Sequence, residues 1–353
     1  MYLALKEIKH EKLRYGLIIA MIVLISYLIF VLTSLALGLA NENTEAIDSW
    51  DANSVVLNKD SNISLGQSFI SNDEADKIDM TNKDAYLGQA SVVAKASGHE
   101  QISSSYLGIN KSQFIFKGLK LSSGHKATKN FEVVADEQFK NDGYKLGDKV
   151  KLNSYVHKFT IVGFTKGAKL NVAPVLYGNM NGWTELKNAG NTFKASAIVS
   201  KKNKVNVGDT NLKSYTMKTF INKLPGYSAQ NQTFTFMIAF LMIISLIVIA
   251  VFLYILTIQK LPNYAVLRAQ GIPAKVLVQT TISQSVILVI SGLIIGTILT
   301  VATALLIPTS VPMNFNFPIL SLVAVGLVLT SVLGAIIPVR TILKVDPVTV
   351  IGG

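Results

Sequence analysis

Four long apolar runs dominate the hydrophobic pattern of this chain. The first covers residues 17–39, follows the basic residues Lys12 and Arg14, and contains no charged side chain. At about 1.5 Å per residue, a helix of this length crosses the roughly 30 Å hydrocarbon core of a bilayer. Residues 233–258, 276–307 and 319–337 form three further runs that also lack Asp, Glu, Lys and Arg. The pattern predicts a membrane α-helical protein with four transmembrane helices, one before and three after a long polar segment.

The first apolar run also has an interpretation as a cleaved signal peptide. Gly38-Leu39-Ala40 resembles a small-x-small cleavage site. The run is longer than the roughly 7 to 15 apolar residues of a usual signal sequence. We therefore interpret it as a helix that stays in the membrane.

The polar segment of residues 40–232 predicts a large mixed α+β domain. It contains no apolar run long enough to span a bilayer, and turn residues such as Asn141-Asp142-Gly143 separate short β-rich stretches. Polar and apolar residues alternate in 149–152 and again in 158–162, which predicts a hairpin with one buried face. Further strands are predicted at residues 54–57, 90–94, 133–135, 173–177 and 195–199, and a short capped helix is predicted at 72–77.

The distribution of basic residues predicts the orientation of the helices. The loop of residues 259–275 carries Lys260, Arg268 and Lys275 without any acid, whereas the loop of residues 308–318 is uncharged. The positive-inside rule therefore places the first of these loops in the cytoplasm. The predicted order is a cytoplasmic segment (1–16), helix 1 (17–39), an extracytoplasmic domain (40–232), helix 2 (233–258), a cytoplasmic loop (259–275), helix 3 (276–307), a short extracellular loop (308–318), helix 4 (319–337) and a cytoplasmic tail (338–353).

Composition excludes several kinds of chemistry. The chain has no cysteine, which excludes disulfides, thiolate metal sites and thiol catalysis. Its net charge of +12 comes from scattered lysines rather than a basic cluster with aromatic residues, so nucleic acid is not an expected partner. The four histidines show no metal-ligand spacing, and no pair of carboxylates has the pattern of an acid/base couple. We therefore predict no catalytic residue, no metal site and no intrinsic cofactor.

Two cytoplasmic segments resemble the FtsX/MacB family of ABC transporter permeases. The tail Pro338-Val339-Arg340 with Asp346-Pro347-Val348 resembles the P-x-R-x-A-x-x-x-D-P-V ending of that family. Residues 264–272, with the sequence YAVLRAQGI, resemble its E-I-G-I-L-R-A-x-G-A segment. Gly147-Asp148 before residues 159–163 is similar to its G-D-x-V and F-x-V-x-G stretch. With the layout of one plus three spans, the resemblance covers essentially the whole chain.

The resemblance implies that ATP is hydrolysed on a separate ATP-binding subunit. The chain itself has no G-x-x-x-x-G-K-[ST] loop, since residues 124–128 lack the first glycine and the spacing. The partner would dock on a short helix at residues 264–269 and on the tail, with Lys260, Tyr264, Leu267 and Arg268 as coupling residues. The alternative for Lys260 and Arg268 is that they only anchor the helices at lipid headgroups.

The resemblance also implies a permease homodimer. In the third span, Gly292-x-x-x-Gly296 permits close approach of another helix because two glycines four residues apart leave a flat face. This face is expected to lie either at the dimer interface or in helix packing within one subunit.

Within the family, the ends of the first two spans are similar to the haem-exporting permeases of Gram-positive bacteria. The similarity lies in residues 38–43 and in Tyr254 with residues 257–260. It implies a multi-pass protein of a Gram-positive cell membrane, with haem as a transported substrate. Tyrosine is one of the axial ligand types for haem iron, so Tyr227, Glu42 and Glu45 are the candidate haem-binding residues. The alternative for Tyr227 is an aromatic residue of the membrane interface.

Three classes of function follow from these observations. The first is a permease that exports haem or another amphipathic molecule, such as a peptide or lipid. The second is a mechanical transmitter that drives an extracellular cell-wall hydrolase, and the third is a membrane receptor without an ATPase. The uncharged spans offer no polar route through the bundle, which favours a substrate taken from the outer leaflet.

Overall fold

The computed structural model describes residues 11–308 and 311–343. Most of the predicted N-terminal segment, two positions of the loop 308–318 and the Asp346-Pro347-Val348 end of the tail lie outside these residues. The chain divides into two compact units. We call residues Met1–Gly38 with Asn231–Gly353 the membrane unit, and residues Leu39–Gln230 the domain.

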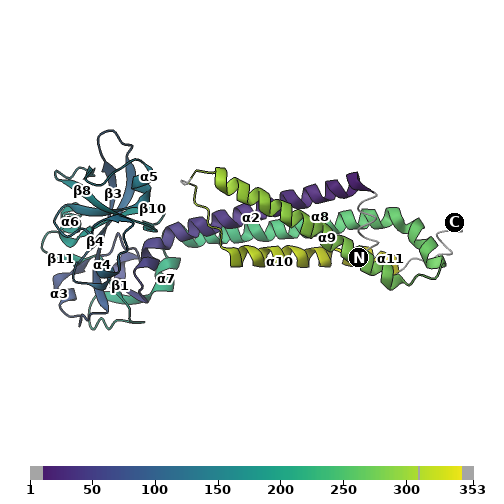
Figure 1. Ribbon diagram of the computed structural model, residues 1–353. Helices are drawn as coiled ribbons and strands as arrows, with labels where there is room; N and C mark the ends of the chain where they lie inside the picture. The colour runs from purple at the N-terminus through teal and green to yellow at the C-terminus, as the bar shows by residue number, and fades with distance from the viewer. Residues whose placement is uncertain (1–10, 309–310, 344–353) are drawn as a thin grey trace. The chain divides into compact units, whose positions relative to one another are not determined.

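Four long apolar helices confirm the predicted arrangement of one span before the domain and three after it (Figure 1). The fourth apolar segment, Phe317–Leu343, contains two helices in succession. The helices are α2 (Lys12–Ser49), α8 (Tyr227–Ala269), α9 (Ala274–Leu306), α10 (Phe317–Gly334) and α11 (Ile336–Leu343).

Two helices run further than their apolar sequences. α2 continues from Leu39 to Ser49, and α8 continues through Pro262 to Ala269. The prediction of a short separate helix at residues 264–269 is therefore wrong, because these residues form the end of α8. Pro262 removes one backbone hydrogen bond, but the surrounding leucine, alanine and tyrosine residues allow the helix to continue. The chain turns only after Ala269, where Gly271 adopts φ +87°, a conformation that glycine tolerates best.

The surface of the membrane unit requires a lipid environment. Phe236, Phe240 and Leu322 are 63%, 63% and 71% exposed, although all are large and apolar. Other apolar side chains face inward and form a core around Ile29, Leu253 and Leu288. Exposed apolar faces of this extent mark contact with another apolar phase, and four spans identify that phase as a bilayer.

The domain contains a mixed eleven-stranded sheet, which confirms the predicted α+β class. Its main path runs β13-β1-β12-β3-β4-β10-β6-β8-β5, with β7 and β9 paired off this path. β4 is parallel to β10 and β6 is parallel to β8, while the other pairs are antiparallel. One buried core contains Trp50 and Tyr177, and a second contains Phe159 and Trp183. The domain is therefore a folded body with its own apolar core.

The strands lie close to the predicted positions. The hairpin is confirmed as β7 and β8, with Val150 opposite Phe159. Residues 195–199 are divided between two strands, because the chain shifts sheet at Ser196, whose backbone bonds Leu87. The strands are β1 (Ser54–Asn58), β2 (Ile70–Ser71), β3 (Asp84–Lys95), β4 (Ile102–Ile109), β5 (Ser123–Gly124), β6 (Glu132–Asp136), β7 (Lys149–Leu152), β8 (Lys158–Thr165), β9 (Lys169–Leu170), β10 (Ala173–Asn179), β11 (Phe193–Ala195), β12 (Ala197–Ser200) and β13 (Leu212–Thr216).

Short helices connect these strands. The predicted helix at residues 72–77 is α3, which begins with a capping box between Ser71 and Glu74 and ends at Ala75. Reciprocal bonds of this kind satisfy backbone groups that a helix end leaves free. The short helices are η1 (Lys59–Ser61), α3 (Asn72–Ala75), α4 (Phe114–Gly118), α5 (Glu137–Asn141), α6 (Met180–Leu186) and α7 (Met217–Asn222).

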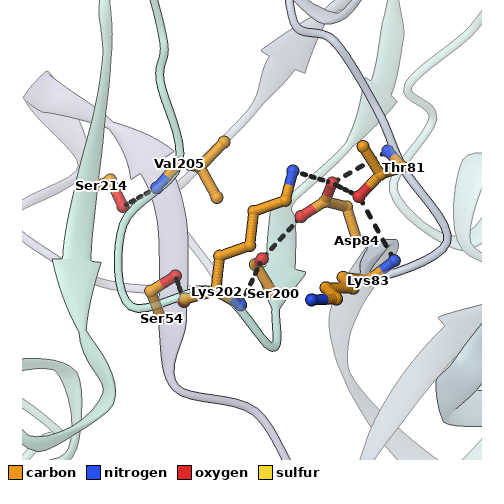
Figure 2. Close-up of polar contacts among 8 residues, drawn as sticks. All are labelled: Ser54, Thr81, Lys83, Asp84, Ser200, Lys202, Val205 and Ser214. Atoms are coloured by element: carbon orange, nitrogen blue, oxygen red, sulfur yellow. Dashed lines mark hydrogen bonds and ion pairs between the residues drawn. The ribbon is translucent and has the colours of Figure 1, made fainter.

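A buried carboxylate ties β3 to β12 and the loop after it (Figure 2). Asp84 accepts hydrogen bonds from Ser200 Oγ at 2.5 Å and from Lys202 Nζ at 2.8 Å, and its side chain is 0% exposed. Thr81 donates to the same carboxylate through its backbone nitrogen and its hydroxyl. Burial raises the pKa of Asp84, but these hydrogen bonds, first that from Lys202, outweigh burial and hold the pKa below its usual range.

Candidate substrate and coupling sites

Glu42 lies in an ion pair at the part of α2 that belongs to the domain. Its Oε1 lies 2.5 Å from Lys169 Nζ, and the two side chains are only 12% and 13% exposed. Little water reaches this pair, so the attraction is stronger than at a surface. Losing either partner would leave a largely buried charge without compensation.

The chain just after Lys169 is also hydrogen-bonded to α2. The backbone nitrogen of Asn171 donates to Asn43 O and that of Val172 donates to Glu42 O, each at 3.2 Å. Asn171 and Val172 both have positive φ, +51° and +66°. For a β-branched valine this conformation is strained, and such strain persists only where surrounding contacts impose it. The segment after β9 is therefore held firmly against α2.

Glu45 lies one helical turn after Glu42, outside the predicted span of residues 17–39. Its carboxylate accepts hydrogen bonds from Asn41 Nδ2 at 3.0 Å and from Lys169 N at 3.3 Å. Burial, with a smaller contribution from the charge of Asp136, raises the pKa of Glu45 to about 7. Glu45 therefore changes charge near neutral pH.

Asp136 completes this group of acids. Its Oδ2 accepts from Ala168 N at 3.0 Å and its Oδ1 accepts from Gln138 N at 2.9 Å. Burial raises the pKa of Asp136 despite these bonds. The charge of Lys169 thus acts on all three carboxylates, and of the three, that of Glu42 forms the ion pair with its ammonium. Among the described residues, no group of three metal-ligating side chains is placed to hold a metal ion.

Tyr227 is the first residue of α8. Its side chain is half-buried and packs against the core cluster that contains Trp50 and Phe220. Within residues 11–308 and 311–343, no hydrogen bond joins it to Glu42 or Glu45. The structure therefore brings the two predicted acids together at Lys169, but does not join the predicted tyrosine to them.

Lys260 lies inside the helix bundle rather than on its surface. It is 6% exposed, and its Nζ donates to the hydroxyl of Tyr15 on α2 at 2.9 Å. The ammonium also lies 5.4 Å from the centre of the Tyr15 ring, within the range of a cation–π interaction. Lys260 therefore joins α8 to α2.

The other predicted coupling residues differ in exposure. Tyr264 is 2% exposed and packs with Leu277 and Ile342, while Leu267 and Arg268 are half-buried. The exposed face of this end of α8 carries residues outside the predicted coupling set, namely Pro262, Asn263, Val266 and Ala269. Val266 is 46% exposed and apolar, so it is the better candidate for contact with another chain.

Gly292 and Gly296 face α2 of the same chain. A Cβ at Gly292 would collide with Ile22, and one at Gly296 would collide with Ser26 Oγ. Ser26 Oγ also donates to Gly292 O at 3.4 Å. The two glycines therefore allow α9 to pack closely on α2 within one chain, while a role at a dimer interface stays a prediction.

Three important residues were missed by reasoning from sequence. Lys169 and Asp136 meet Glu45 from more than ninety positions away, and Tyr15 meets Lys260 from 245 positions away. No local pattern marks such residues, because their pairing depends on how distant segments pack.

Comparisons with known proteins agree with the helix arrangement. Residues 235–347 match the family model described as the C-terminal part of FtsX-like permeases. A protein of Staphylococcus haemolyticus described as a putative hemin transport system permease protein HrtB is 25% identical over 354 residues, covering 100% of this chain and 99% of its own length. A protein of Staphylococcus epidermidis with the same description is 27% identical over 355 residues, with the same coverage.

Two solved structures are also similar to part of this chain. The periplasmic region of MacB from Actinobacillus actinomycetemcomitans is 18% identical with a TM-score of 0.36, covering 48% of this chain and 90% of that chain. The extracellular domain of the transporter YknZ from Gram-positive bacteria is 13% identical with a TM-score of 0.32, covering 42% and 81%. The family match covers residues 235–347, and the two staphylococcal relatives match the chain over its whole length. The chain is therefore similar to FtsX-like permeases, the membrane subunits of ABC transporters whose ATPase is a separate subunit.

Proposed function

We propose that this permease exports haem from the membrane, with both termini in the cytoplasm and the domain outside the cell. The observation that carries the proposal is the similarity to permeases described as hemin transport proteins over the whole length of both chains. Similarity that extends through the domain as well as the spans includes the parts that would contact a substrate.

The membrane unit offers an apolar place for such a molecule. A cavity of about 400 Å³ is lined by Phe30, Phe315, Phe317, Thr300 and Leu320. Its walls are largely aromatic and aliphatic, which suits the flat apolar face of a porphyrin better than an ion or a sugar. This supports a substrate that partitions into the bilayer.

Purified permease, reconstituted with its ATPase in nanodiscs, provides the direct test. Haem should stimulate ATP hydrolysis, whereas iron-free protoporphyrin should do so less if an axial ligand contributes. Tyr227→Phe should weaken haem binding several-fold, and Tyr215→Phe, at a half-buried tyrosine that packs against the same core cluster, is the matched control. No stimulation by haem, with stimulation by an amphipathic peptide or lipid, would move the assignment to that substrate.

Glu42 needs a test that separates haem contact from its ion pair with Lys169. If Glu42 serves haem directly, Glu42→Gln should weaken haem binding and Lys169→Gln should not. If the ion pair only holds the segment after β9, both substitutions should weaken binding alike. The double variant should then be no worse than either single one.

The ATP-binding subunit is proposed to dock on the exposed face of α8 near Val266. Val266→Asp should abolish binding of that subunit while the permease remains folded, because a charge at an apolar contact must be desolvated. Leu267→Asp should also destabilise the permease, since Leu267 packs on the Tyr264 cluster. A complex that survives Val266→Asp at normal affinity would place the docking site elsewhere.

A homodimer and a role as a mechanical transmitter remain further proposals. The continuous helix α2, which runs from the membrane unit to Ser49 in the domain, favours transmission of motion, because a helix is stiff along its axis. If ATP hydrolysis changes the accessibility of cysteines placed in the domain but no substrate stimulates it, the transmitter is the better assignment. Cross-linking in native membranes tests the homodimer.

A further inference from the structure

Asparagine side chains gather where three adjacent strands of the domain sheet, β4, β10 and β6, begin or end on the same side. β4 ends at Ile109, which lies opposite Asn179, the last residue of the parallel strand β10. β6 pairs antiparallel with β10. Asn130 and Phe131, which come just before β6, therefore lie at the same end of these strands. Because neighbouring strands lie about 4.8 Å apart, side chains that follow or precede these strand ends line a common cleft.

The cleft has the size of a ligand site and little net charge. Its volume is about 570 Å³, within the range of small-molecule sites. The charged residues in its lining are one carboxylate, Glu185, and one ammonium, Lys194. Five carboxamides dominate the polar surface, from Asn72, Asn110, Asn130, Asn181 and Asn191.

These carboxamides keep hydrogen-bonding capacity for a ligand. Asn130 Oδ1 accepts from Asn179 Nδ2 at 2.6 Å and from Asn181 Nδ2 at 3.4 Å. Asn110 Oδ1 accepts from Ser112 Oγ at 3.1 Å and from Ser112 N at 3.3 Å. Within the described part of the chain, neither amide nitrogen of Asn110 and Asn130 has a hydrogen-bond partner, and the side chain of Asn191 has none. A carboxamide can donate two hydrogen bonds and accept two. Local bonds therefore use the acceptor oxygens of Asn110 and Asn130 and orient these groups, while their amide nitrogens and the Asn191 side chain keep capacity for a ligand.

Aromatic rings form the other part of the lining. Phe131, Tyr86 and Phe193 contribute, and Phe131 adopts φ +61°, which is unfavourable for a bulky side chain. Its ring stacks on His157 with centroids 5.0 Å apart, and its carbonyl accepts from Thr160 N at 2.7 Å. Backbone strain of this kind gathers at binding sites, where surrounding contacts maintain it.

We infer that this cleft binds a neutral oligosaccharide. A sugar presents adjacent hydroxyls, which each donate and accept, and a ring face of C–H groups. Carboxamides match the hydroxyls and aromatic rings cover the C–H face, whereas the single ammonium offers little to a phosphate or nucleotide. The inference rests on the extracytoplasmic position proposed for the domain, where glycans are accessible, and it is independent of haem.

Binding is tested on the full-length permease in nanodiscs. The probes are tetrasaccharides of N-acetylglucosamine, glucose in β-1,4 linkage and glucose in α-1,4 linkage, measured by calorimetry and saturation-transfer NMR at millimolar concentration. At least one should bind saturably, and the Asn181→Ala, Asn191→Ala double variant should weaken it at least tenfold. Asn82→Ala, at an exposed asparagine outside the cleft, should have no effect, and Phe193→Leu should weaken binding with the fold retained.

Three results would overturn the inference. They are no saturable binding by any of the tetrasaccharides, binding unchanged in the double variant, and binding of uncharged tetrapeptides at this cleft in place of sugars. Haem-stimulated ATPase activity measured on the same variants separates the two proposals, because the cleft variants should leave it at the parent level.

Discussion

The membrane unit and the domain satisfy their buried polar groups in different ways. In the membrane unit, Thr280, Thr281 and Thr300 each donate to the carbonyl four residues earlier in the same helix. In the domain, Asp84 bonds Lys202 and Gln89 bonds Ser105, both from other strands or loops. Within a bilayer no water can complete a hydrogen bond, and the local carbonyl is always present. The helices are therefore defined locally, whereas the domain depends on pairs that form only as the sheet assembles.

Some polar groups of the membrane unit do bond another helix, as Ser285 Oγ does to Ser331 O at 3.0 Å, and Lys260 is the charged member of this set. It is the one charged residue among the described buried residues of that unit, and it bonds Tyr15 on another helix. A polar pair of this kind gives α8 and α2 a specific contact where apolar packing alone would be less selective.

The largest difference is expected in labelling from outside the cell, because the domain is proposed to lie outside and the loop after α8 in the cytoplasm. Because the chain has no cysteine, single cysteines report without background. Ser103→Cys in the domain should react with an impermeant maleimide on intact cells, and Gln270→Cys after α8 should react only after permeabilisation. Both positions are exposed, so a cysteine that does not react lies on the side of the membrane that the reagent cannot reach. The reverse pattern would overturn the proposed topology.

The domain should lose more stability than the membrane unit when one polar pair is broken. Asp84→Asn should lower the free energy of unfolding of the domain by about 2–3 kcal/mol, because Lys202 and Thr81 lose a charged acceptor. Asp51→Asn is the control, since that carboxylate is 86% exposed in its pair with Lys201 and exposed ion pairs contribute little to stability. Both tryptophans, Trp50 and Trp183, lie buried in the domain, so their emission during denaturation reports this unit.

Unfolding at low pH provides a second measurement of the Asp84–Lys202 pair. The pKa of Asp84 is lower in the folded state than in the unfolded chain, where it is about 3.9. Its contribution to stability is therefore complete above about pH 4 and is lost as the pH falls through the lower folded pKa. The parent protein should lose stability in that window, and Asp84→Asn should lose less. Equal acid sensitivity in both proteins would contradict this role.

The same difference between the units explains what the sequence could predict. Four spans and the β7–β8 hairpin follow from local periodicity, and both are present. The continuation of α8 through Pro262 was not predicted, because a proline usually signals a helix end. The partners Lys169 and Tyr15 were also not predicted, since they lie far in sequence from Glu42 and Lys260. Periodicity records which face of an element is buried, but not which distant residue covers it.

Steric packing should dominate the stability of the membrane unit. Gly292→Val should destabilise it by about 1–3 kcal/mol, because the added atoms collide with Ile22 on α2. Ile22→Ala should restore part of this loss by making room. Gly16→Ala, where a Cβ meets nothing within 4 Å, should be neutral or slightly stabilising. The readout is the temperature at which monodisperse protein in detergent is lost, and equal values for all variants would show that this contact does not limit stability.

The smallest effect is expected from Glu45, an acid whose pKa is raised in the folded domain. Its pKa is raised to about 7 by burial, then by Asp136 and Glu42, with Lys169 acting in the opposite direction. In the unfolded chain the pKa of a glutamate is about 4.3, so the folded state holds this proton more tightly. The domain therefore loses stability as the pH rises from about 4.5 through 7. Glu45→Gln keeps a similar shape without the charge, so it should remove this slope and leave the variant more stable above pH 7, by on the order of 1 kcal/mol after allowance for solvent screening. Thermal unfolding followed by tryptophan emission between pH 5 and pH 8 measures the difference. A slope that persists unchanged in Glu45→Gln would mean that another group titrates there, and Asp136→Asn would then be the next variant to compare.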